Sequence, residues 1–175
     1  MKIKTANITF DKAWLFRLNT ILFILAFSIP FLISGPQILT GTMVNALLFI
    51  FATKQIKQND LYLISFLPGL GALSNGLLFG KFTLYLLFFL PFIWLGNLVL
   101  IWSFNKVRLH TVFPLTVIIP AVIKAALLYL SAVILVGNHL VPKVFLSSMG
   151  MVQTLTALLG GIIVSVLFRI AGRKI

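Results

Sequence analysis

Apolar residues occupy long runs along this chain, and short groups of basic and polar residues separate the runs. Most runs are close to 20 residues long, the length at which a helix crosses a hydrocarbon core of about 30 Å. A membrane β-barrel would instead need polar residues at every second position, and these are absent. The pattern predicts an all-α membrane protein, a compact bundle of six transmembrane helices. The predicted helices cover about residues 13–33, 38–53, 61–79, 82–104, 111–136 and 145–170.

The connections between the predicted helices are short and rich in turn-forming or charged residues. The segment Ser34-Gly35-Pro36-Gln37 ends the first run, and a turn from Gly137 to Lys143 separates the last two. No separate soluble domain fits between the runs, so residues 1–175 are expected to form one domain. The first run is too long for the core of a signal peptide and leads directly into further helices. We expect it to be retained.

Basic residues gather on one side of the predicted bundle. The chain holds 14 Lys and Arg against 2 Asp and Glu, a formal charge of +12. Eleven of the basic residues lie before or near the start of the first helix, or at and after the ends of the second, fourth and sixth, whereas only Lys81 and Lys143 fall on the other side. The positive-inside rule then predicts that the N- and C-termini are both cytoplasmic. Topology thus explains the charge, and a nucleic-acid partner is not expected.

Lys124 lies near the middle of the fifth run and has no acidic residue to pair with, because Asp11 and Asp60 lie outside the runs or at their ends. A lysine at bilayer depth costs about 3 kcal/mol on insertion scales, so such residues are usually functional. Its counter-charge is expected to be a small molecule with an anionic or carbonyl group. The sequence leaves open two alternatives. The buried amine could be neutral, or the side chain could reach the membrane interface by snorkelling.

Other polar residues also fall within the apolar runs. Each could simply form a hydrogen bond to a neighbouring helix. Together with Lys124 they resemble the wall of a polar cavity, and Trp94 is a candidate to cover an apolar ring of the ligand. Helix-interrupting prolines could open space for such a cavity. These polar residues are Asn45, Asn75, Asn97, Thr154, Thr156 and, one turn before a small-residue stripe, Gln153; the prolines are Pro30, Pro68, Pro91 and Pro120.

Small residues recur every four positions on several predicted helices, which lets helices approach closely in lipid. We interpret these stripes as internal packing faces, with a surface for a partner protein as the alternative. The stripes are Ala72, Gly76 and Gly80; Ala121 and Ala125; and Ala157, Gly161 and Ser165.

Catalytic and cofactor chemistry is not expected. The chain has no cysteine, and His110 and His139 lie in opposite connections without a second ligand at metal spacing. It has no carboxylate pair, no Ser-His-Asp set and no phosphate-binding loop. An enzyme is therefore the least favoured class, no cofactor or metal is expected, and any energy source must lie elsewhere.

Three segments and Lys124 resemble a known family. The segments are residues 35–48 (GPQILTGTMVNALL), 91–97 (PFIWLGN) and 149–161 (MGMVQTLTALLGG). The chain resembles, over about residues 30–165, the substrate-binding (S) components of energy-coupling factor (ECF) transporters. The resemblance implies a subunit that captures a vitamin- or micronutrient-like molecule from the outer side and works with a transmembrane coupling protein and a pair of ATPases. It also implies a location in the cell membrane of a bacterium or archaeon. Carried over to this chain, the candidate substrate-binding residues are Gln37, Thr40, Asn45, Asn97, Lys124 and Gln153.

One feature departs from this family. Many S components carry two alanines four residues apart on the first helix, where the coupling protein docks, but here Pro30 stands four residues after Ala26. Two other classes therefore remain open: a small channel or carrier acting as an oligomer, and a membrane assembly or structural protein. A channel would need a continuous polar path and a proton-coupled carrier would need an acidic residue, and neither is visible in the sequence.

Overall fold

A computed structural model describes residues 12–33, 35–54, 57–76 and 80–172, and its ordered elements are all helical in this part of the chain. This confirms the all-α fold expected from the sequence. The elements are α1 (Lys12–Leu32), α2 (Gln37–Ala52), α3 (Gln58–Asn75), the short 3₁₀ helix η1 (Gly80–Tyr85), α4 (Leu86–Val107), α5 (Leu115–Gly137), α6 (Val144–Met149) and α7 (Met151–Ile170).

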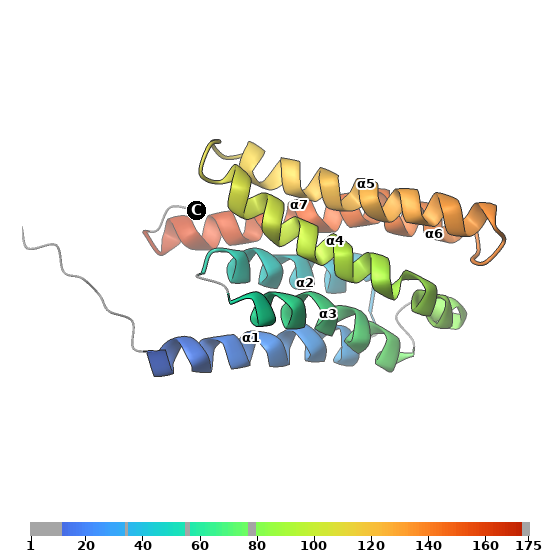
Figure 1. The fold of residues 1–175 in the computed structure, drawn as a ribbon, viewed down its shortest axis with the longest axis horizontal. Coiled ribbons are helices and arrows are strands. Elements are labelled where there is room, and N and C mark those ends of the chain that lie inside the picture. Colours follow the sequence, from blue (N-terminus) through green and yellow to red (C-terminus); the bar gives the residue numbers. More distant parts are fainter. Residues whose placement is uncertain (1–11, 34, 55–56, 77–79, 173–175) are drawn as a thin grey trace, which may run out of the picture.

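The long helices lie side by side and close into a ring (Figure 1). Going around the ring, α1 packs against α3, α3 against α4, α4 against α5, α5 against α7, α7 against α2, and α2 back against α1. Successive long helices run in opposite directions. Two ends of the bundle are thereby defined. The basic end carries Lys54, Lys57, Lys106, Arg108 and Arg169, and the opposite end carries the α5–α6 connection with Lys143.

Three stretches are long and apolar enough to cross a membrane, which indicates a membrane protein. They are Phe82–Val107, Leu115–Gly137 and Val144–Ile170. Two shorter apolar helices, Leu18–Leu32 and Gln37–Ala52, accompany them in the described part of the chain. Large apolar side chains such as Leu130, Ile134 and Leu167 are exposed on the outside of the bundle, as expected for helices that face lipid.

The interior holds two hydrophobic clusters, one toward each end of the bundle. Toward the basic end, Phe49 packs against Phe104 with ring centroids 5.1 Å apart. Toward the opposite end, Phe89 stacks on Phe145 at 5.0 Å. On α4 and α5, the buried polar residues Asn97 and Lys124 lie in the sequence between members of the two clusters. They form a polar layer inside an otherwise apolar core.

Several helix boundaries differ from the sequence expectation. The predicted helix 61–79 begins earlier and ends at Asn75, because Gly76 adopts a left-handed conformation (φ 72°) and caps α3. Residues 77–79 lie outside the described residues. The predicted helix 82–104 starts as η1 and extends to Val107, and the predicted helix 111–136 starts only at Leu115, after Pro114 at its N-cap.

The predicted helix 145–170 is two helices. Gly150 separates α6 from α7 with φ −97° and ψ −92°, outside the helical region. The ring of Tyr129 on α5 lies against Gly150, and a Cβ there would come within 2.8 Å of the ring atom Cδ2. Only glycine therefore lets α5 approach the break so closely.

Two of the three small-residue stripes pack inside the bundle as expected. Ala121 and Ala157 are fully buried, and Gly161 lies so close to Val117 of α5 that an added Cβ would overlap that side chain. The prediction of a stripe on the third helix is wrong. Gly76 caps the end of α3 and Gly80 belongs to η1, so these two residues do not share a helical face with Ala72.

Candidate functional site

Lys124 faces the centre of the ring because of its place in the helical repeat of α5. The buried residues of this helix recur every three or four positions, and Lys124 falls between Ala121 and Leu128 on that face. Its side chain is only 3% exposed. Gly96 of α4 packs beside the lysine stem, and a Cβ there would be in ordinary contact, 3.4 Å from Cγ of Lys124.

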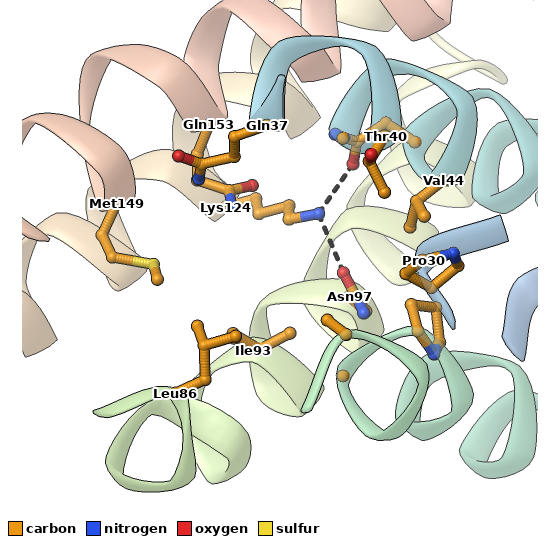
Figure 2. Close-up of a pocket in the computed structure, with 15 residues that line it drawn as sticks. Pro30, Gln37, Thr40, Val44, Leu86, Ile93, Asn97, Lys124, Met149 and Gln153 are labelled. Carbon is orange, nitrogen blue, oxygen red and sulfur yellow. Dashed lines mark hydrogen bonds between the residues drawn. The ribbon is translucent and has the colours of Figure 1, made fainter. Parts of the chain in front are cut away.

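The amine of Lys124 donates hydrogen bonds to two asparagines on other helices (Figure 2). Nζ lies 2.7 Å from Oδ1 of Asn45 on α2 and 2.8 Å from Oδ1 of Asn97 on α4. Both asparagines are 1% exposed. The apolar runs contain no carboxylate within them, and the amide oxygens of Asn45 and Asn97 accept hydrogen bonds from the lysine instead.

Each asparagine is held in turn by a second partner. Nδ2 of Asn97 donates to the main-chain oxygen of Ser65 at 2.8 Å, and Nδ2 of Asn45 donates to Oγ1 of Thr156 at 3.1 Å. These bonds fix which way each amide points, with its oxygen toward Lys124. The network joins α2, α3, α4, α5 and α7.

A cavity of about 80 Å³ adjoins this network. All six candidate residues from the sequence line it, together with apolar side chains that include Val44, Ala72, Leu86, Ile93 and Met149. The candidate residues are Gln37, Thr40, Asn45, Asn97, Lys124 and Gln153. The lining residues come from the end of α1, the start of α2, the end of α3, the start of α4 and the α6–α7 break, which places the cavity toward the opposite end of the bundle.

Polarity and exposure change along the cavity. Gln37 and Gln153 are half-buried, whereas Thr40, Asn45 and Lys124 are at most 3% exposed. Nε2 of Gln37 also donates to the main-chain oxygen of Ser148 at 3.3 Å, which links the start of α2 to α6. The two glutamines thus stand nearer the surface than the lysine network.

Four residues expected in the cavity wall do not line the cavity: Trp94, Asn75, Thr154 and Thr156, of which Thr156 instead accepts a hydrogen bond from Asn45. Trp94 lines a separate hollow of about 470 Å³ on the outer side of α3 and α4, where its ring meets the edges of Tyr62 and Phe66. Asn75 donates to the main-chain oxygen of Phe31 and does not line the cavity. The hydroxyl of Thr154 donates a hydrogen bond to the main-chain oxygen of Gly150, just before the start of α7.

The sequence did not reveal the apolar residues that line the cavity, or the main-chain oxygen of Ser65 to which Asn97 donates. The sequence carries no signal for the main-chain oxygen of Ser65, because Pro68 frees the main-chain oxygen of Ile64, four residues earlier, and not that of Ser65. Pro30 and Pro68 do line the cavity, as the prolines suggested, but Pro91 and Pro120 do not. Nothing in the apolar pattern separates Leu86 or Ile93 from ordinary core residues.

A second lysine, which is half-buried, lies away from the site. Lys54 follows α2 at the basic end, and its Nζ has no hydrogen-bond partner among the described residues. Burial lowers the pKa of Lys54 from 10.5 to about 8. It stands at the far end of the bundle from the cavity and belongs to a different environment.

The arrangement can bind but offers little for catalysis. Within the described residues, no group of three His, Cys, Asp or Glu side chains could hold a metal ion. The lining residues that the structure describes supply one basic side chain, four amides, one hydroxyl and apolar groups, and no acid. Comparisons with protein-family models, with curated proteins and with solved structures give no match to this chain.

Proposed function

We propose that this chain is the membrane-embedded substrate-binding subunit of an ECF-type importer. In this proposal the six long helices all span the cell membrane and both termini are cytoplasmic. The subunit captures a small vitamin- or micronutrient-like molecule that carries an anionic or carbonyl group. The observation that carries the proposal is the cavity beside Lys124, where a lysine with no acidic partner lies among amides inside the bundle.

The position of the cavity supports capture from the outer side. The basic end is expected to face the cytoplasm by the positive-inside rule. The cavity is lined from the opposite end, where the described connection carries only Lys143. A ligand arriving from outside would meet Gln37 and Gln153 first and Lys124 last.

Release of the ligand into the cell would need partners. The sequence has no nucleotide-binding motif, so the energy is assigned to a coupling protein and an ATPase pair, as the resemblance implies. Ala26 is 1% exposed and packs in the core, so it is not free to form a docking stripe on the outside of α1. The coupling protein would have to use another surface.

One observation favours a second candidate, a membrane assembly or structural protein. Lys124, Asn45 and Asn97 satisfy one another and connect several helices, which is also what a purely structural polar network does. The distinction is whether the network recognises a small molecule.

The test compares two lysine substitutions by native mass spectrometry of the full chain in mild detergent. Lys124→Met keeps an unbranched side chain but removes the amine, and Lys143→Met removes an exposed lysine at the same end of the bundle. We expect the wild type and Lys143→Met to retain a small molecule that Lys124→Met loses. A folded Lys124→Met protein that retains the same molecule would contradict the proposal.

A further inference from the structure

The hydroxyl of Thr40 differs from most of the other helical hydroxyls in this chain. Ser65, Ser103, Ser165 and Thr154 each donate to the main-chain oxygen four residues earlier. Thr40 is 2% exposed, and its Oγ1 has no hydrogen-bond partner among the described residues. A buried hydroxyl without a partner is costly, and this one lines the cavity. Thr40 and Lys124 both line this cavity (Figure 2).

Lys124 has one hydrogen-bond donor left for a ligand. An ammonium carries three N–H groups, and the two asparagine oxygens use two of them. Because Ser65 and Thr156 hold the asparagine amides, these cannot turn their oxygens away from the lysine without losing a second bond. The buried part of the cavity therefore presents an N–H of Lys124 and the O–H of Thr40, and it contains no carboxylate that would repel an anion.

The size and walls of the cavity restrict what fits. Its volume of about 80 Å³ is about half of the roughly 150 Å³ that admits benzene in an engineered apolar cavity. Among the described residues, the lining includes no aromatic side chain on which a ring could stack. Val44, Ala72, Leu86 and Ile93 supply aliphatic surface instead.

We infer, building on the proposed function, that the ligand is a short-chain aliphatic carboxylate of about two to four carbons. One carboxylate oxygen accepts from Nζ of Lys124 and the other from Oγ1 of Thr40. The hydrocarbon tail packs against the aliphatic wall. A neutral amide of the same shape lacks the charge that the lysine favours, and an aromatic acid exceeds the cavity.

The test measures binding of radiolabelled propionate to the full chain in mild detergent, with competition by acetate, butyrate, propionamide and benzoate. We expect propionate to bind, acetate and butyrate to compete, and propionamide and benzoate to compete at least about tenfold more weakly. Thr40→Val should weaken propionate binding about tenfold or more, since a hydrogen bond to a charged group is lost, and Thr40→Ser should restore it.

Thr42→Val is the matched control. Thr42 lies on the same helix and its hydroxyl also has no partner among the described residues, but it does not line the cavity. Equal effects of Thr40→Val and Thr42→Val, or preference for benzoate or propionamide, would overturn the inference. Absence of propionate binding to a wild type that carries a Lys124-dependent ligand would overturn it while the proposed function stands. Propionate binding that survives Lys124→Met would overturn both.

Discussion

Lys124 and its two asparagines form a unit in which each residue satisfies the others. Removing one partner from such a buried polar set usually costs more than removing the whole set, because the remaining groups lose their hydrogen bonds. In this chain the effect should be visible at Asn97, which links Lys124 to the main chain of α3.

The coupling can be measured with Asn97→Leu, Lys124→Met and the double variant. Asn97→Leu leaves Lys124 with one acceptor and removes the donor to Ser65, so we expect a loss of about 2–3 kcal/mol in the free energy of unfolding. The double variant should be more stable than the sum of the single effects predicts, by about 1 kcal/mol or more. Equilibrium unfolding in detergent micelles provides the values, and additive effects would contradict the unit.

At this scale the sequence was informative about the polar half of the site. A lysine in an apolar run, together with four amides and one threonine in the matching segments, gave six candidate residues that line one cavity. The sequence did not predict the position of Trp94, because the apolar pattern around an aromatic residue does not show which way its side chain faces. The ring packs outward against Tyr62 and Phe66.

The helices of this bundle depend on close approach at a few glycines. A Cβ at Gly160 of α7 would come within 2.7 Å of the main-chain nitrogen of Ala46 and 2.9 Å of the main-chain oxygen of Thr42, both on α2. Main-chain atoms cannot move aside as a flexible side chain can. The contact between α2 and α7 is therefore set by this residue.

Gly160→Ala should accordingly destabilise the protein by about 1–3 kcal/mol through overpacking. The matched control is Gly137→Ala at the end of α5, where an added Cβ meets nothing within 4 Å. There we expect no loss, or a gain of up to about 1 kcal/mol from the higher helix propensity of alanine. Thermal unfolding in detergent distinguishes the two, and an equal effect would show that the α2–α7 contact adapts.

Element boundaries show where pattern reasoning succeeds and fails. The predicted helices 13–33 and 38–53 agree with α1 and α2 to within one residue, because Gly35 and Pro36 end one run and begin the next. The break at Gly150 was missed because methionines flank it and the apolar pattern continues. Gly150 lies against Tyr129 of α5, a contact that the local sequence does not reveal.

Over the whole molecule, the charge distribution and the cavity lie at different ends. The positive-inside rule and the up-and-down order of the helices together predict that Lys57 faces the cytoplasm and Lys143 faces outward. Both lysines are exposed, and the chain has no cysteine, so single cysteines can be placed at either position without background labelling.

A membrane-impermeant maleimide should label Lys143→Cys in intact cells and Lys57→Cys only after permeabilisation. Each variant removes one basic residue, so the two serve as controls for each other. The reverse labelling pattern would place the cavity on the cytoplasmic side, and capture from outside would no longer hold.

The hydrogen bonds of Lys124 have a consequence for the energetics of the whole bundle. They join α5 to α2 and α4 and, through the asparagines, to α7 and α3. A ligand that drew the amine away from either asparagine would weaken the cohesion between those helices as it bound. By reciprocity, any change that loosens α4 from α5 would raise the affinity for that ligand. For such a ligand, binding to the site and weakening of the contact between α4 and α5 would be thermodynamically coupled.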